Sequence, residues 1–362
     1  MQRILSLDIL KLFAMFLVIW GHCVQHLLSS HFLDEPAYIY IYSFHMPLFF
    51  MISGLFVHRM PVSAAQCAGL LLTKARQLIL PCIAWGLLMG LGNMLLPFIN
   101  GTTPDKPLWS TLWTNFWFLK SLFFCFCLWY ISVSLVRKPW LAALVSLIIS
   151  QCIVVHEVQW SYPAFLAGIY VGAHLDTIRR YRRPIALSAF IIGGLLLIGW
   201  NKSFFTLPSV YAWSTLSSDA ILLSILMRLY RFAVNLTLSL GFIALFLGID
   251  ATHPIQQSTA SLTQQSTASL TPLHIRYRLA SYGRLTLGIY IIHSMFFMVR
   301  ERICPTLLCC DSLYPWLFNI VVAPLLSVVL LLVCIALTRL LMRLPWLSFF
   351  FLGTPLPLRQ AA

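Results

Sequence analysis

Long apolar stretches constrain what this chain can fold into more than any other feature of its sequence. They lie at about 4–28, 37–57, 68–97, 112–136, 139–155, 160–176, 184–200, 229–249, 285–299 and 315–338. A helix needs about 20 mostly apolar residues to cross the hydrocarbon core of a bilayer. Charged residues make up only 9% of the chain, whereas a soluble domain carries roughly 25%. The sequence therefore predicts an all-α, polytopic integral membrane protein with about ten transmembrane helices.

The excess of basic residues predicts how these helices are oriented. The chain has 24 Lys and Arg against 10 Asp and Glu, and membrane proteins concentrate Lys and Arg in their cytoplasmic loops. With a cytoplasmic N-terminus, most of the basic residues fall at inner positions, including the cluster Arg179–Arg183. An even number of spans then places the C-terminus in the cytoplasm as well. The positive charge is thus interpreted as topology, with the lipid bilayer and not a nucleic acid as the partner.

The spans follow one another closely enough to form a single transmembrane domain over 1–345, with a C-terminal tail at 346–362. One long inner connection, at 250–284, contains a perfect tandem repeat, because Gln256–Thr263 and Gln264–Thr271 both read QQSTASLT. Duplicated small and polar residues are typical of a tolerant loop. We therefore expect a flexible cytoplasmic loop there, with replication slippage as the origin of the repeat.

Cysteine and histidine residues raise two further questions. Cys304, Cys309 and Cys310 share one predicted outer connection, where they either pair as a disulfide or stay free. His22 and His26 have the i, i+4 spacing of two metal ligands on one helix face, but a metal site needs further ligands. No carboxylate lies near them in the sequence. No metal is expected.

The first predicted helix carries an unusual set of polar residues: Asp8, Lys11, His22 and His26. Lys11 and His22 are 11 residues apart, which is about three turns plus 20°, so they share one helix face roughly 16 Å apart along the axis. Asp8 lies one turn from Lys11 and can neutralise it. Ionisable residues inside a span are costly and face the protein interior. Two interpretations stay open: a catalytic face, or core histidines with Asp8 and Lys11 as interfacial anchors.

The first two apolar stretches also carry a family resemblance. LDILKLFAMFLVIWGH at Leu7–His22 places ten residues between Lys11 and His22, and FHMPLFFMISGLF follows at Phe44–Phe56. This succession resembles the membrane acyltransferase-3 family, whose members have ten residues between an Arg or Lys and an essential His in the first helix. The second motif is most similar to the fucose 4-O-acetylase-like branch of that family.

Three later motifs fall in the family's order, so that the resemblance extends over about 8–340. Lys74-Ala75-Arg76 is similar to the basic motif that opens the third helix. NFWFLKSLF at Asn115–Phe123 resembles the Trp-Phe-Leu motif of the fourth helix, and YGRLTLGIYIIH at Tyr282–His293 resembles a late Gly-Ile-Tyr-x-x-His motif. With the first two motifs, they identify 1–345 as one acyltransferase-3 domain.

The resemblance implies an integral O-acyltransferase of a bacterial cytoplasmic membrane. Such a protein moves an acyl group, most often acetyl, from cytosolic acyl-CoA to a hydroxyl of a carbohydrate or cell-envelope glycan, without a bound cofactor. His22 would act as general base on that hydroxyl, assisted by Lys11 and Asp8. A covalent acyl-histidine relay stays open as the alternative. Lys11 stands where many relatives have Arg, so it keeps the charge but lacks the bidentate fork.

The donor and the acceptor call for further groups. The phosphates of coenzyme A require cations on the cytoplasmic side, for which Lys74 and Arg76 are the candidates unless they are only topological anchors. The candidates for lining the substrate cavity are polar or aromatic residues of the predicted spans: His45, Ser53, Trp117, Tyr290 and His293.

A secondary transporter or a flippase for a sugar-containing substrate is the alternative function. Coupled transporters usually keep acidic residues inside their spans. The predicted topology places only Asp8 there and leaves the other acidic residues in connections or at helix ends. The sequence therefore favours the acyltransferase over the transporter.

Overall fold

The computed structural model describes residues 4–28, 32–57, 60–61, 63–100, 116–153, 157–202, 204, 218–251, 272–303 and 314–355. Helices and the turns between them account for this part of the chain, and it contains no strand, so the all-α prediction is confirmed. The tandem repeat at 256–271 and Cys304, Cys309 and Cys310 lie outside the described residues.

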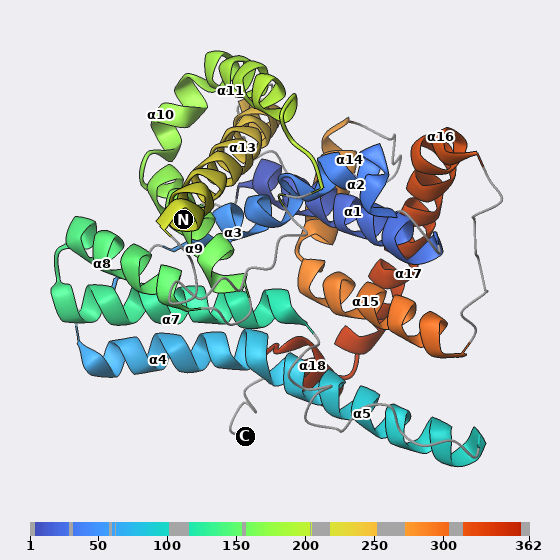
Figure 1. Cartoon of the computed structure of the whole chain (residues 1–362). Helices are drawn as coiled ribbons and strands as arrows, with labels where there is room; N and C mark the ends of the chain where they lie inside the picture. Colours follow the sequence, from blue (N-terminus) through green and yellow to red (C-terminus); the bar gives the residue numbers. More distant parts are fainter. Residues whose placement is uncertain are drawn as a thin grey trace, which may run out of the picture.

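The helices follow one another along the chain, mostly with short connections (Figure 1). Their bounds are α1 (Leu5–Leu27), η1 (Phe32–Asp34), α2 (Pro36–Tyr42), α3 (His45–Leu55), α4 (Ala64–Lys74), η2 (Ala75–Ile79), α5 (Leu80–Asn100), α7 (Trp117–Val136), α8 (Pro139–Cys152), α9 (Val158–Ala173), α10 (Leu175–Arg180), α11 (Arg182–Leu197), α13 (Ser218–Ala251), α14 (Pro272–Gly283), α15 (Thr286–Ile303), α16 (Pro315–Leu317), η5 (Phe318–Val322), α17 (Ala323–Met342) and α18 (Pro345–Leu352).

Several of these helices are long and apolar enough to cross a bilayer. In the described part of the chain, six segments meet this condition: Leu5–Leu27, Pro36–Leu55, Ala64–Gly92, Trp117–Val136, Leu222–Ile249 and Pro315–Met342. A pair of helices bent by 65°, α14 with α15, would make a seventh. The spans expected at 139–155, 160–176 and 184–200 are helices of 14, 16 and 16 residues. The chain is thus a multi-pass membrane protein, whereas the count of ten and the cytoplasmic termini stay predictions.

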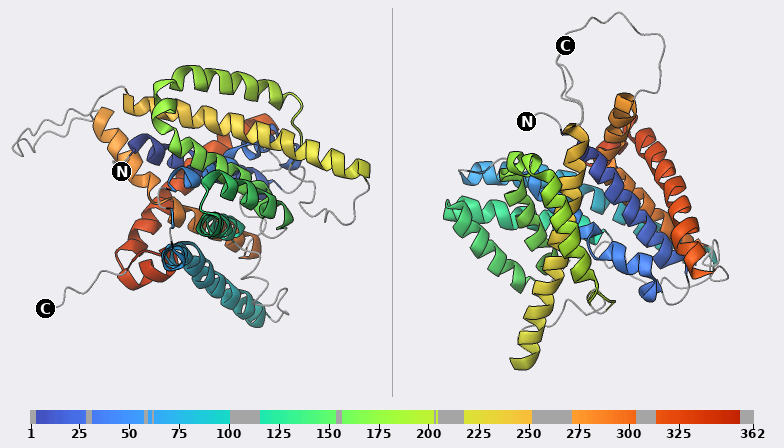
Figure 2. Two further views of the ribbon diagram at one scale, coloured as in Figure 1. Left: turned by 90° about the vertical axis from the view of Figure 1, so that its left-hand side faces the viewer. Right: turned by 90° about the horizontal axis from the view of Figure 1, so that it is seen from above.

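Helix α1 lies at the centre of the bundle. It packs against α3, α13, α14, α15 and α17, which come from both halves of the sequence (Figure 1). Its buried residues include Leu10, Met15 and Ile19, and also the carboxylate-bearing Asp8. Helix α13 has 34 residues and extends past its neighbours beside α11 (Figure 2). The polar face of the first helix is therefore held inside the protein, as the cost of polar groups in lipid requires.

Helices α3 and α9 pack with their backbones in direct contact at three glycines. A methyl group added to Gly54 would overlap the carbonyl of Phe165, and one added to Gly168 would overlap the carbonyl of Met51. At Gly172 the added carbon would lie 2.6 Å from the Leu55 carbonyl oxygen. Small residues four apart are a common means of close helix packing in membranes. The Gly of the Ser53-Gly54 pair therefore serves packing against α9.

The prediction of a flexible loop over 250–284 is wrong for its last residues. Positions 272–283 form α14, which packs against α1, and Gly283 leaves room for the backbone carbonyl of Asp8. Leu279 and Tyr282 contact the main hydrophobic core. The helix alternates such apolar residues with Arg276 and Arg278, so its low average hydrophobicity concealed it.

The prediction of a C-terminal tail over 346–362 is also wrong for residues up to 355. Helix α18 begins at Pro345, a residue that suits the first turn of a helix. The helix packs against α5, α15 and α17. Trp85 Nε1 donates to the backbone oxygen of Phe351 over 2.9 Å. Gly353 then turns the chain in the left-handed region, with φ 64°. Ser348 and Leu352 are the buried residues of this segment, PWLSFFFL, and hold it against the bundle.

The close packing of α3 on α9 yields a test with a matched control. Gly168→Ala places a methyl group on the Met51 carbonyl and should lower the free energy of unfolding by about 1–3 kcal/mol. Gly194→Ala on α11, where an added methyl meets nothing within 4 Å, should leave stability unchanged or slightly higher. Thermal unfolding of the purified protein in detergent measures both. Equal melting temperatures for Gly168→Ala and the parent chain would contradict the packing described.

Candidate active site

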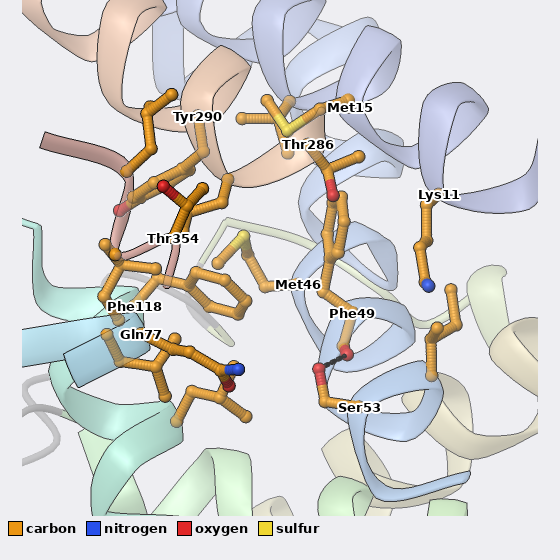
Figure 3. Close-up of a pocket in the computed structure, with 18 of the residues that line it drawn as sticks. Lys11, Met15, Met46, Phe49, Ser53, Gln77, Phe118, Thr286, Tyr290 and Thr354 are labelled. Atoms are coloured by element: carbon orange, nitrogen blue, oxygen red, sulfur yellow. Dashed lines mark hydrogen bonds between the residues drawn. The ribbon is translucent and has the colours of Figure 1, made fainter. Parts of the chain in front are cut away.

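A cavity of about 380 Å³ opens between helices that are distant in the sequence. Its walls come from α1, α3, η2, α7, α15 and the segment after α18 (Figure 3). Most of the lining is apolar, and the polar members are Lys11, Ser53, Gln77, Thr286, Tyr290 and Thr354. Lys11 lies at one side of the space, with Gln77, Tyr290 and Thr354 at the other (Figure 3). A mostly apolar cavity with a few polar groups is the usual form of a small-molecule site.

Lys11 is held at the wall of this cavity by two contacts. Its Nζ lies 3.3 Å from Oδ1 of Asp8, one turn earlier on α1. The same ammonium lies 4.3 Å from the ring centroid of Phe56, which follows α3. Asp8 is buried where α14 closes on α1 at Gly283. The predicted neutralisation of Lys11 by Asp8 is therefore present, and it places a cation beside an apolar space.

The face of α1 that begins at Lys11 divides into two parts. Lys11, Met15 and Val18 line the cavity, at spacings of four and three residues. His22, four residues further, does not line it within the described part of the chain. Its ring centroid instead lies 5.1 Å from that of His293 on α15 and 5.5 Å from that of His26. A histidine cluster, made of His22, His26 and His293, thus lies one turn beyond the cavity.

Two nitrogens of this cluster are buried without a hydrogen-bond partner among the described residues: Nδ1 of His22 and Nε2 of His293. His293 donates from Nδ1 to the backbone oxygen of Ile289 over 3.0 Å. The neutral ring therefore carries its lone pair on Nε2. Buried polar atoms normally have partners, and exceptions call for an explanation such as a catalytic role. No three His, Cys, Asp or Glu side chains in the described ranges are placed to hold a metal ion together.

Of the five residues expected at the substrate cavity, Ser53 and Tyr290 line it. Ser53 donates its hydroxyl to the backbone oxygen of Phe49 over 2.8 Å. Tyr290 also lies beside the histidine cluster, with 5.6 Å between its ring centroid and that of His293. Tyr290 therefore borders both parts of the site. His293 belongs to the cluster and not to the cavity wall.

His45 and Trp117 are not among the described residues that line this cavity, so their expected role at a substrate cavity stays a prediction. His45 is buried, donates from Nδ1 to the backbone oxygen of Ile41 over 2.7 Å and packs edge-on to Tyr42. At the start of α7 the neighbour of Trp117, Phe118, lines the cavity and contacts Tyr290, with ring centroids 5.3 Å apart. The motif at 115–123 therefore contributes to the wall through Phe118, Leu119 and Leu122, which follow its tryptophan.

Lys74 and Arg76 lie shortly before cavity-lining residues in the sequence. In the described part of the chain, neither of them lines the cavity itself. The Lys74 ammonium lies 4.1 Å from the ring centroid of Phe126. Arg76 belongs to the π-helical turn η2, whose next residues, Gln77 and Leu78, do line the cavity. Such turns shift the register of a helix and are frequent at functional sites.

Sequence reasoning missed three polar lining residues: Gln77, Thr286 and Thr354. Gln77 directly follows the basic motif, and Thr286 lies inside the motif at 282–293, so both were within reach. Thr354 was assigned to the tail. No local pattern indicates that a segment so far along the chain closes a cavity built on the first helix.

One family of known proteins matches almost the whole chain, and individual relatives match part of it. A family described as an acyltransferase domain matches residues 4–339. Nodulation protein NolL of Mesorhizobium japonicum is 27% identical over 224 residues, which are 56% of this chain and 57% of that protein. Nodulation protein NolL of Sinorhizobium fredii is 24% identical over 216 residues, which are 56% and 58% of the two chains. The chain thus spans little more than half the length of these curated relatives. No solved structure matches it.

The segment that closes the cavity can be tested at its turn. In Gly353→Ala the new Cβ would lie 2.5 Å from the Arg76 carbonyl oxygen, at a positive φ, so the turn should be weakened by about 1–2 kcal/mol. Limited proteolysis should then cleave after α17 faster than in the parent chain. Phe350→Ala is the control, because that side chain is 44% exposed. If both variants resist proteolysis equally, the segment does not depend on this turn.

Proposed function

The chain belongs to the acyltransferase-domain family that matches its residues 4–339, and on this premise we propose that it moves an acyl group from cytosolic acyl-CoA to a hydroxyl of a carbohydrate or cell-envelope glycan. We propose acetyl as the acyl group. The observation that carries the proposal is one helix face that has a paired cation at an apolar cavity and a buried histidine cluster one turn beyond it.

The cavity suits the pantetheine arm of the donor. Its apolar walls accept the extended arm, whose length is comparable with the distance from Lys11 to His22, and the Lys11 ammonium attracts the negative charge of the donor. Asp8 keeps Lys11 in place without leaving the region highly charged. Lys74 and Arg76, just before the lining residue Gln77, are the cations proposed to attract the phosphates of coenzyme A.

The histidine cluster suits the proton transfer. As the acceptor hydroxyl oxygen bonds to the thioester carbon, His22 takes the hydroxyl proton. The carbon–sulfur bond breaks, and the thiolate takes up a proton and leaves as free coenzyme A. His293 lies beside His22 with a free lone pair on Nε2, so it is placed to position His22 or to share the proton. In the alternative relay, a nitrogen of His22 would first carry the acyl group.

Replacement of His22 tests the proton-transfer role directly. His22→Ala should lower turnover by about 100-fold or more, because a general base contributes that much to a rate. Release of free coenzyme A thiol from acetyl-CoA, by purified full-length protein with a glycan acceptor, is the measurement. His174→Ala is the matched control, since His174 follows α9 at an exposed position away from the cavity. Full turnover in His22→Ala would rule out this mechanism.

The charge at position 11 gives a second, graded test. Lys11→Met removes the cation beside the pantetheine arm and should reduce kcat/KM by about 10- to 100-fold, mainly through a higher KM. Lys11→Arg keeps the charge and should stay within about tenfold of the parent chain. A loss confined to kcat in Lys11→Met would mean that Lys11 acts on the reacting groups and not in donor binding. Equal activity of all three proteins would exclude Lys11 from the reaction.

A further inference from the structure

A second cavity, of about 560 Å³, lies between α8, α9 and α13. Among the described residues it shares no lining side chain with the cavity at Lys11. Its polar members are Gln151, Gln159, Trp160, Tyr170, Arg228, Arg231 and Asn235, and we call it the arginine–tryptophan cavity. Nothing in the proposed acyl transfer uses it.

Two arginines of α13 pack around one indole in this cavity. The guanidinium carbon of Arg228 lies 5.0 Å from the Trp160 ring centroid, and that of Arg231 lies 4.2 Å from it. Arg228 also donates from Nη1 to Oε1 of Gln151 over 3.1 Å. Both arginines lie within the candidate span Leu222–Ile249. Cations inside a span are costly, face a cavity or the protein interior, and mark functional positions.

The charges around the cavity leave it positive. The carboxylate of Glu157, at the start of α9, interacts electrostatically with Arg231, and Arg228 adds a second cation beside it. Among the described residues, two guanidinium groups therefore face one carboxylate, Glu157. Cation–π attraction to the indole face offsets part of the repulsion between the two arginines. A charge-assisted hydrogen bond to an anion would be stronger than this contact with the indole.

Further hydrogen-bonding groups lie in the same wall. Nε1 of Trp160 and Oε1 of Gln159 are buried and have no hydrogen-bond partner in the part of the chain that the structure describes. An indole N–H can only donate, so it requires an acceptor oxygen. Asn235 is buried on α13, seven residues after Arg228. A phosphate group offers an acceptor oxygen to the Trp160 N–H, whereas Oε1 of Gln159 is itself an acceptor and requires a donor.

The outward-facing wall of the cavity is mostly apolar. Tyr170 is 67% exposed and Leu229 is 59% exposed, although both line the cavity. On the outside of a membrane bundle, such side chains contact lipid chains. A span of 28 residues is about 42 Å long and exceeds the roughly 30 Å hydrocarbon core. Centred on that core, the helix overhangs it by about 6 Å at each end. Arg228, about 9 Å from the start of the span, and Arg231, about 14 Å from it, therefore lie inside the hydrocarbon edge, from where long side chains reach towards the headgroups.

We propose that the arginine–tryptophan cavity binds the phosphate headgroup of an anionic membrane lipid. Arg228 and Arg231 bind the phosphate oxygens, the indole N–H of Trp160 donates to one of them, and the acyl chains lie along Leu229 and Tyr170. A neutral lipid lacks the anion, and a free phosphate ion lacks the chains that the apolar wall accepts.

Lipid binding to the purified full-length protein tests this site without any acyl transfer, so its result is separate from that for the proposed enzyme. Dioctanoyl phosphatidic acid is titrated against the protein in a neutral detergent, and binding is followed by native mass spectrometry. Arg228→Gln/Arg231→Gln should weaken binding about tenfold or more, because both charge-assisted interactions are lost. The matched control is Arg183→Gln/Arg343→Gln, which removes two exposed arginines and should change affinity by less than about twofold.

Two competitor arms distinguish the ligand classes. Dioctanoyl glycerol, which lacks the phosphate, should not compete, and inorganic phosphate at the same concentration should not compete either. Trp160→Phe keeps an aromatic face but loses the N–H donor, and should weaken binding several-fold even if the double arginine variant fails to fold. Unchanged affinity in folded Arg228→Gln/Arg231→Gln or in Trp160→Phe would overturn the proposal. Equal competition by either competitor would overturn it too.

Discussion

The cost of polar groups in hydrocarbon is the constraint on which the rest of this structure depends. Helix α1 carries Asp8, Lys11, His22 and His26 in one predominantly apolar segment, and a membrane offers them no water. The bundle satisfies the constraint by surrounding α1 with α3, α13, α14, α15 and α17. The ion pair of Asp8 and Lys11 is closed in by α14 at Gly283. The helix whose polar groups would be most costly to expose to lipid therefore lies at the centre of the fold.

Two regions of different chemistry follow from that arrangement. Near the start of α1, Lys11 faces an apolar space that segments from both halves of the chain enclose. One turn beyond Val18, His22 and His293 meet, and each has a ring nitrogen with no hydrogen-bond partner within the described ranges. Tyr290 borders both. This division suits a reaction that needs a cation at one point and a proton acceptor at another. Because the ammonium and the imidazoles lie apart, the positive charge does not weaken the imidazoles as proton acceptors.

Much of this could be predicted from residue order alone. Apolar stretches of span length predict helices in a bilayer, and the spacing of Lys11 and His22 predicts a shared helix face, since both depend only on local geometry. The motif from Leu7 to His22 pointed to the family. Local patterns were weaker where composition was mixed or the chain turned: α14 was taken for part of a loop and α18 for a tail.

The sequence by itself determined that the chain is helical, crosses a membrane several times and carries Lys11 and His22 on one face of its first helix, because these properties follow from composition and periodicity. Only the tertiary structure decided which side chains meet. His22 and His293 are separated by most of the chain, and the wall at Thr354 comes from its end. The two arginines around Trp160 likewise come together only when α13 packs beside α9. Such contacts depend on how whole helices pack, and glycines at their crossings set how closely they approach.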